Sequence, residues 1–289
     1  MTSWCGTSRS IRCRWTRPGP SWGKKDKHCD PGDPGDREQG SWWDHVLLDA
    51  DSRLIVTLVI GRRDTQTARQ AFADFYRRTD GDLTPLITSD EYAPYLTVIT
   101  ETYGVRKEEL ELTEEQKVEY DYEGMPEVYF PVEMAYATVH KDREQGRVVR
   151  VEPRVVLGSE EQVAEALRAG TTSETVNTSY VERYHGTQRH FNARKARKAY
   201  TFSKELSFHV AVTWLCVTFY NFGWAPRTLR VRVRGRLPRY RYRTPAMVAG
   251  LTDRRWSMAD ILTYPLFSSN QRPGGPQQRH GDPENREAG

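Results

Sequence analysis

The sequence predicts a mixed α/β protein, and three consecutive segments carry that prediction. Residues 43–61 contain two β-rich runs separated by a short polar turn, which is the pattern of a strand hairpin. Residues 64–78 follow with apolar side chains at helical spacing behind Asp64, a residue that caps helices well. Residues 85–90 are a short apolar run that stops at a carboxylate, as expected for a buried strand with an exposed end.

Further strands and helices are predicted along the rest of the chain. Residues 101–133 hold eleven Asp or Glu against three Lys or Arg, which favours a peripheral insertion over a core element. Two strand-like runs and an amphipathic helix fill residues 134–170, and another helix begins after Asn177. An apolar helix is expected over 203–222 and a short helix over 247–251.

Composition restricts the class of protein. The 289 residues are 37% hydrophobic and 28% charged, which excludes a collagen-like chain and a fully disordered one. The four cysteines show neither metal-binding spacing nor a disulfide framework. The most apolar stretch, 208–224, contains polar residues and is predicted to be a buried core helix, so no membrane span is expected. The net charge of +4 is small, and the local distribution of charge is more informative.

Asp90 and Glu182 are the candidate catalytic and metal-binding residues. Asp90 stands where a buried strand ends, and Glu182 lies one turn into a helix with cationic neighbours. Carboxylate oxygens are the ligands that Mg²⁺ prefers, and two-metal phosphoryl transfer uses two or three such groups. Each residue also has a simpler interpretation. Asp90 or Ser89 can be the N-cap of the next helix, and Glu182 can be a solvated acid on a helix surface.

Basic residues follow Glu182 and form the candidate DNA-binding surface. Arg189 lies two helical turns after Glu182, so both side chains point to the same side, where a phosphate near a metal would meet the guanidinium. Residues 227–243 add eight arginines, interleaved with tyrosines and without an acid. A merely solvated basic surface or an exposed edge strand would have the same composition. The candidate DNA-binding residues are Arg183, Arg189, Arg194, Lys195, Arg197 and Lys198.

The segment around Glu182 resembles a known family. The stretch NTSYVERYHGTQRHFNARKARK is similar to the end of the catalytic domain of bacterial transposases of the insertion-sequence-one family, where an N-T-S-x-[IV]-E run carries the final Glu and a basic residue follows seven positions later. Glu182 and Arg189 match these places. ITSDEYAPY resembles the family's second-Asp segment and assigns that role to Asp90. TPAMVAGL, residues 244–251, resembles a C-terminal motif of integrase-like transposases.

The resemblance implies a DDE enzyme that cuts DNA and transfers strands with two Mg²⁺ or Mn²⁺ ions. Its fold would be ribonuclease-H-like, a mixed sheet flanked by helices. The catalytic domain would span 23–222 with an insertion at 101–170, followed by a basic extension at 223–266. The composition of the terminal segments predicts disorder at 1–22 and 267–289. Element ends and target DNA would be the partners of a homo-oligomer, at a cytoplasmic, nucleoid-associated location and away from any membrane.

The first Asp of this family is missing from the sequence. Family members carry it on the first strand in a run like D-E-x-W-S-F-V-G-K-K, and counting back seven from Gly23 lands on Thr16. No strand is predicted in residues 12–22. A reading frame shifted by one nucleotide can encode Val-Asp-Glu-Ala-Trp-Ser-Phe-Val-Gly across codons 14–23, so we expect the chain upstream of codon 22 to be out of frame. Asp44 and Asp49 are the nearest substitutes.

Three function classes remain open at this point. The first is a DDE transposase, with catalysis weakened by the missing Asp. The second is a non-catalytic DNA-binding remnant of such an enzyme, which would hold element ends without cutting them. The third is a cellular ribonuclease-H-like nuclease, which would cut generic hybrid duplexes. Magnesium-dependent strand transfer that Glu182→Gln abolishes would separate the first class from the second.

Overall fold

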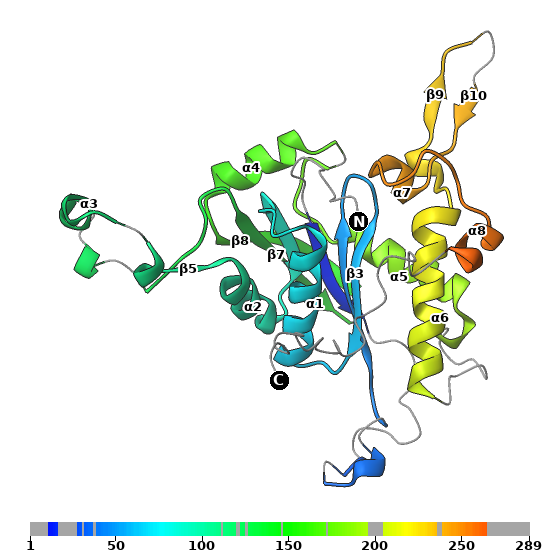
Figure 1. Cartoon of the computed structure of the whole chain (residues 1–289), viewed down its shortest axis with the longest axis horizontal. Coiled ribbons are helices and arrows are strands. Elements are labelled where there is room, and N and C mark those ends of the chain that lie inside the picture. The colour runs from blue at the N-terminus through cyan, green and yellow to red at the C-terminus, as the bar shows by residue number, and fades with distance from the viewer. Residues whose placement is uncertain are drawn as a thin grey trace, which may run out of the picture.

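A mixed six-stranded sheet forms the centre of the molecule in a computed structural model of the chain (Figure 1). The structure describes residues 11–16, 28–30, 32–36, 39–110, 112–119, 122–124, 127–145, 147–171, 173–195, 205–235 and 239–264, and only the backbone of 11–16. The strands of the sheet are β1 (Ile11–Thr16), β2 (Trp43–Asp49), β3 (Ile55–Gly61), β4 (Leu86–Asp90), β7 (Ala135–Glu144) and β8 (Arg147–Leu157).

The strand order is β3-β2-β1-β4-β7-β8. Neighbours among β3, β2 and β1 are antiparallel, whereas β1, β4 and β7 run parallel to one another and β8 is antiparallel to β7. The sheet is therefore mixed, and helices lie on both of its faces (Figure 1). The predicted α/β class with a mixed sheet flanked by helices is confirmed.

The central strand β1 corrects the expectation that residues 12–22 contain no strand. All six of its residues pair with β2, from Ile11 opposite Asp49 to Thr16 opposite Asp44. On its other side β1 is parallel to β4. The sequence IRCRWT alternates apolar and polar residues, which is the period of a strand. Residues 17–27, which include the expected Gly-Lys-Lys, lie outside the described residues.

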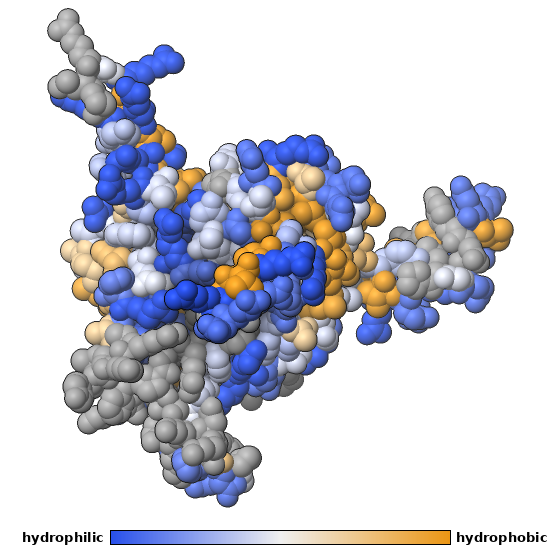
Figure 2. All heavy atoms as spheres, turned by 180° about the vertical axis from the view of Figure 1, so that it is seen from behind, coloured by the Kyte–Doolittle hydropathy of each residue, from blue (hydrophilic) through white to orange (hydrophobic). Residues whose placement is uncertain are grey.

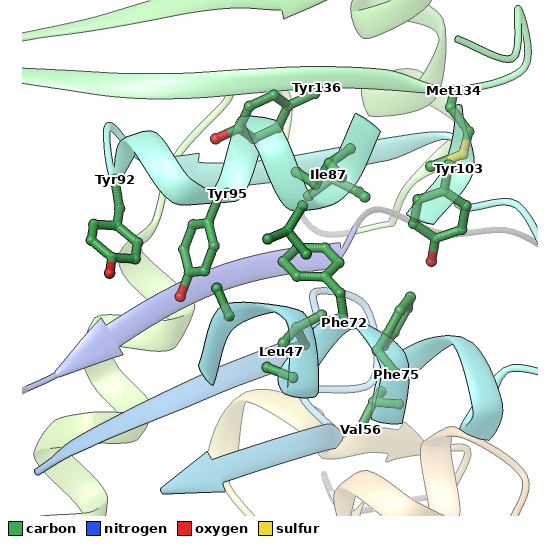
Figure 3. Packing of buried hydrophobic residues seen from close by; sticks show 14 of the residues in the cluster. Leu47, Val56, Phe72, Phe75, Ile87, Tyr92, Tyr95, Tyr103, Met134 and Tyr136 are labelled. Carbon is green, nitrogen blue, oxygen red and sulfur yellow. The ribbon is translucent and has the colours of Figure 1, made fainter. Parts of the chain in front are cut away.

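The first face of the sheet is covered by α1 (Thr65–Arg78) and α2 (Ala93–Tyr103). Asp64 caps α1 as predicted, because its carboxylate accepts a hydrogen bond from the Thr67 amide at 2.7 Å. Figure 3 shows side chains of both helices meeting those of the strands in one apolar cluster. Fully buried members of this cluster include Leu47, Phe72, Phe75, Ile87 and Tyr95.

The second face is covered by α4 (Glu160–Ala169), α5 (Ser179–Phe191) and α6 (Leu206–Thr218). Successive residues of a strand point to opposite faces. The neighbours of Leu47 and Ile87 therefore face these helices. Val46 and Leu48 pack with side chains of α5 and α6, and Leu86 packs with side chains of α4.

Two segments project from opposite sides of the sheet (Figure 1). One is an arm with the paired strands β5 (Val105–Arg106) and β6 (Val128–Tyr129) and the helix α3 (Glu114–Glu119), and none of the residues in these three elements is buried. The other is the hairpin of β9 (Val231–Val233) and β10 (Arg239–Arg241), whose strand residues are all exposed. Figure 2 shows both projections as largely hydrophilic. The acidic excursion was expected from residue 101, but α2 continues to the buried Tyr103.

The C-terminal part adds short helices beside α6. A π-helical turn, Phe219–Gly223, continues α6, and α7 (Pro245–Val248) and α8 (Met258–Thr263) follow the hairpin. Sequence periodicity did not predict α8. In the stretches that the structure covers, no helix combines the length and the hydrophobicity needed to cross a bilayer, and α6 has only 13 residues. Short 3-10 turns occupy Pro34–Asp36, Lys107–Glu109, Tyr122–Gly124, Ala193–Lys195 and Arg227–Leu229.

Candidate functional site

Asp90 is the last residue of β4, at the carboxyl end of the parallel strands. The four preceding strand residues are buried, whereas Asp90 is partly exposed. The N-cap of the following helix α2 is Tyr92, so neither Ser89 nor Asp90 caps it. The Ser89 hydroxyl instead bonds the hydroxyl of Tyr136 at 2.7 Å. The simpler interpretation of Asp90 as a helix cap is therefore wrong.

The side chain of Asp90 lies on the face of the sheet that α4 and α5 cover. Leu86 packs in the cluster under α4, and Asp90 is four residues further along the same strand, so both share this face. On β7, Val139 is the register partner of Asp90 and belongs to the same cluster. Lys141 follows Val139 by two residues and faces the same side.

Glu182 reaches β7 from the first turn of α5. Its carboxylate forms an ion pair with the ammonium group of Lys141 and accepts a hydrogen bond from the Thr178 hydroxyl at 3.1 Å. Lys141 also donates to Thr178 at 3.2 Å, so the start of α5 is fastened to the sheet. The side chain of Glu182 is 40% exposed, which leaves the carboxylate accessible. Glu182 is thus a paired acid at the sheet surface, and more than a solvated helix acid.

Strand β7 connects the two candidate carboxylates. Asp90 lies opposite Val139, and Glu182 is bound by Lys141, two residues and roughly 7 Å further along the strand. Both acids therefore belong to one side of the sheet, near the ends of parallel strands. Such a pair can bind a cation. A divalent ion that binds Glu182 has to displace the ammonium group of Lys141 or share the carboxylate with it.

Within the described ranges, no three His, Cys, Asp or Glu side chains are placed to hold a metal ion. Asp44, one of the expected substitutes for the missing acid, forms a buried ion pair with Lys195. The side chains of Asp44 and Lys195 are 2% and 3% exposed, and Lys195 also donates to the side-chain oxygen of Gln188 at 2.8 Å. Asp44 therefore has a structural role, and its charge is already compensated.

Asp49, the other expected substitute, lies at the far end of β2. It is opposite Ile11 at the start of β1, whereas Asp44 is opposite Thr16 at its end. The carboxylate of Asp49 accepts a hydrogen bond from the Ser52 amide at 3.1 Å and holds the β2–β3 turn. Burial raises the pKa of Asp49, with these hydrogen bonds opposing the shift. Neither substitute stands next to Asp90.

The candidate DNA-binding residues of 183–198 occupy different environments. Arg183 and Arg189 are exposed on α5, and Arg194 is half-buried. Lys195 is 4% exposed in its ion pair with Asp44, so its prediction as a surface DNA contact is wrong. Burial lowers the pKa of Lys195, while Asp44 opposes the shift. Arg197 and Lys198 lie outside the described residues.

Of the arginines in 227–243, Arg232, Arg239 and Arg241 lie on the strands of the projecting hairpin. Tyr240 is opposite Arg232, and Arg239 and Arg241 are opposite valines, so both faces of the hairpin carry arginine. The guanidinium of Arg230 stacks over the ring of Tyr240 at 4.0 Å. An exposed ribbon of this kind can contact phosphates along a duplex without rearranging the sheet.

A second polar cluster, which the sequence did not reveal, lies at the same end of β7. His140 bonds Glu91 and, at 2.9 Å, Asp142, and Arg154 binds Glu91 at 3.0 Å. The hydrogen bond to Glu91, followed by that to Asp142, raises the pKa of His140. His140 and Lys141 are adjacent in a strand, so this cluster faces away from Glu182. Only the run of polar residues that ends β7 could have indicated it.

Comparison of the chain with models of known protein families and with curated proteins gives no match.

Proposed function

We propose that the chain is a DNA transposase of the DDE class, in which Asp90 and Glu182 are the second and third acids of the active site. The observation that carries the proposal is the position of these two acids on one face of the sheet, at the end of β4 and on α5, with β7 connecting them. The resemblance of the segments around both residues to insertion-sequence-one-family transposases supports the same roles.

The strand order supports a ribonuclease-H-like fold for this proposal. Three antiparallel strands, β3, β2 and β1, are followed by β4 and β7, which run parallel to β1. The resemblance implies a mixed sheet of this kind flanked by helices, and parallel strands place the residues at their carboxyl ends along one edge. In this arrangement β1 stands next to β4, where the first acid of the family would be.

The residues that are present fit one divalent ion better than two. Mg²⁺ or Mn²⁺ is often held by one or two carboxylates, and water completes its coordination shell. Asp90 and Glu182 can supply these two carboxylates. Such an ion would activate water for attack on a phosphodiester. Two-ion catalysis needs a further acid, which the described residues do not supply here. We therefore assign to this chain DNA binding with strongly reduced strand cleavage.

The basic residues supply the DNA-binding part of the proposal. Arg189 is exposed on α5, two turns after Glu182, and would meet a phosphate near the acids. The β9–β10 hairpin adds exposed arginines at a distance from the sheet (Figure 1). Such contacts bind backbone phosphates and make affinity depend strongly on salt.

A non-catalytic DNA-binding remnant is the second candidate function, and two observations favour it. Glu182 forms an ion pair with Lys141, and Asp44 forms one with Lys195. Neither carboxylate can therefore bind a metal ion without weakening an ion pair. A remnant would bind the element ends or pair with an intact transposase without cutting DNA.

Strand transfer on oligonucleotides that contain element ends separates the two candidates. The chain is compared with its Glu182→Gln variant and with a matched control, Glu165→Gln, an exposed acid on α4. A second comparison replaces residues 15–22 by Val-Asp-Glu-Ala-Trp-Ser-Phe-Val, which puts an aspartate at position 16. We expect salt-sensitive DNA binding by all four proteins and magnesium-dependent cleavage by the repaired chain.

Three outcomes decide the proposal. Cleavage by the repaired chain that a further Glu182→Gln change abolishes, while Glu165→Gln does not, supports a transposase. DNA binding without cleavage in every protein, repaired chain included, favours the remnant. Absence of DNA binding, or hydrolysis of generic RNA–DNA hybrids without preference for element ends, contradicts both.

A further inference from the structure

A small cationic pocket lies on the flank of α5 that faces away from Glu182. Tyr180, Arg183 and Thr187 of α5 line it at positions i, i+3 and i+7, which share one helix face. The opposite wall includes Arg53 of the β2–β3 turn, and Thr228, in the 3-10 turn that precedes the β9–β10 hairpin, completes this wall. The pocket has a volume of about 40 Å³.

Arg53 is held in this pocket by an unusual backbone conformation. Its φ of 65° is in the left-handed region, which costs a non-glycine residue of order 1 kcal/mol or more. The Arg53 amide bonds the carbonyl of Asp49 at 2.9 Å and so fixes the turn. The guanidinium carbon lies 3.3 Å from the centre of the Tyr180 ring, so the group is stacked and cannot swing freely.

One nitrogen of Arg53 remains available for a ligand. Among the described residues, the buried Nη1 atom of Arg53 has no hydrogen-bond partner. A buried donor without a partner loses its hydration without compensation, which costs about 1–3 kcal/mol or more for a charged group. Asp51 is the nearby acid, but Nη1 of Arg53 forms no hydrogen bond to it; the Oδ1 atom of Asp51 accepts bonds from the amide and hydroxyl of Thr171, both at 2.8 Å. An anion in the pocket would satisfy Nη1.

The lining selects the kind of anion. In the described part of the chain the lining contains two arginines, two threonines and no acid. Two guanidinium groups and the hydroxyl of Thr228 provide more donors than one carboxylate can accept, whereas a tetrahedral phosphate can bind to all of them. The hydroxyl of Thr187 lines the pocket but already donates to the carbonyl of Arg183 at 3.1 Å. A volume of about 40 Å³ holds roughly three water-sized atoms, so three oxygens of one phosphate fit while the fourth points out of the pocket, and a sugar or base does not fit.

We propose that Arg53 and Arg183 form a phosphate-binding site in which the phosphate oxygens lie between the two guanidinium groups. The side chains of Tyr220, Trp224 and Pro226 form the rest of the lining. The site is separate from the two acids, because its helix face differs from that of Glu182. The binding site itself does not depend on the proposed function, which bears only on whether the phosphate belongs to DNA.

Binding of inorganic phosphate to the full chain tests the site. Isothermal titration is run at fixed ionic strength, with chloride as the reference anion, on the chain and on Arg53→Asn and Arg183→Gln. Asparagine tolerates the left-handed conformation at position 53. Arg183 is exposed, so Arg183→Gln keeps the test valid if Arg53→Asn fails to fold. Arg168→Gln, an exposed arginine on α4, is the matched control for loss of one charge.

We expect each of the two pocket variants to weaken phosphate binding about tenfold or more, because each removes a charge-assisted hydrogen-bonding group. Arg168→Gln should leave it unchanged. Equal phosphate affinity in Arg183→Gln, Arg168→Gln and the parent chain, or no phosphate binding by the parent, would overturn the proposal.

Binding of a short DNA duplex to the same proteins then shows whether the bound phosphate belongs to DNA. If the phosphate is part of DNA, both pocket variants also weaken duplex binding and reduce its salt dependence; if it is a free phosphate, duplex binding stays constant.

Discussion

Replacing Lys195 by methionine should destabilise the protein strongly, because Asp44 would remain buried without its cation. The side chains of Lys195 and Asp44 are only 3% and 2% exposed. Removing one partner of a buried ion pair typically costs about 3–5 kcal/mol, out of a stability that for most domains is about 5–15 kcal/mol. The double variant with Asp44→Asn should recover much of this loss, since no uncompensated charge stays buried.

Urea unfolding followed by circular dichroism measures these free energies. Arg194→Met is the control, since it removes the charge of the adjacent, half-buried residue. We expect Arg194→Met to change the unfolding free energy by about 1 kcal/mol or less, because Arg194 is only half-buried and Asp44 keeps its ion pair with Lys195. A loss below about 1 kcal/mol for Lys195→Met would refute the buried pair. If the Lys195→Met protein has normal stability but a reduced affinity for DNA, Lys195 contacts DNA as the sequence predicted.

Two further predictions follow from the strand ends and from close packing. Because Glu91 and Asp142 raise the pKa of His140, an NMR titration of His140 should give a midpoint above 6.5, and Glu91→Gln should lower that midpoint. The stabilisation of the folded state by protonated His140 is complete below pH 6.5 and is lost as the pH rises through the raised pKa. A midpoint at or below 6.5 in the parent chain would contradict the cluster. A methyl group at Gly61 would lie 2.3 Å from the Thr67 side chain, so Gly61→Ala should cost about 1–3 kcal/mol. The control is Gly186→Ala in α5, where the added methyl group would have no described atom within 4 Å. This substitution should stabilise the helix by up to about 1 kcal/mol. Equal unfolding midpoints for the two variants would contradict the close contact at Gly61.

Local pattern was enough to predict most of the fold. The hairpin of β2 and β3, the capped helix α1 and the strand that ends at Asp90 each show their period within one segment. β1 was missed because its six residues contain two arginines, and because its stability comes from the strands on both sides. Pairing with distant segments is invisible to a local period.

The candidate site was predictable only in part, for a similar reason. Asp90 and Glu182 could be identified from local sequence, because Asp90 ends a strand and Glu182 lies in the first turn of a helix. Lys141 could not be assigned to Glu182, since 41 residues separate the two and only the packing of α5 on the sheet brings them together. Lys195 was misassigned because it belongs to a basic run, while the contact that buries it lies 151 residues away, at Asp44.

The position of β1 explains how this chain can form a mixed sheet without the acid that the proposed family carries on its first strand. A central strand is held mainly by backbone hydrogen bonds to both neighbours, so it requires an extended chain with alternating residues more than particular side chains. IRCRWT meets that requirement, whereas catalysis would require a carboxylate at one position. Thr16 is opposite Asp44 in the register, so an acid there would come close to the pair of Asp44 with Lys195. Restoring Asp at position 16 is therefore expected to alter the charge at the strand ends while leaving the sheet intact, and unfolding of the repaired chain would contradict this register.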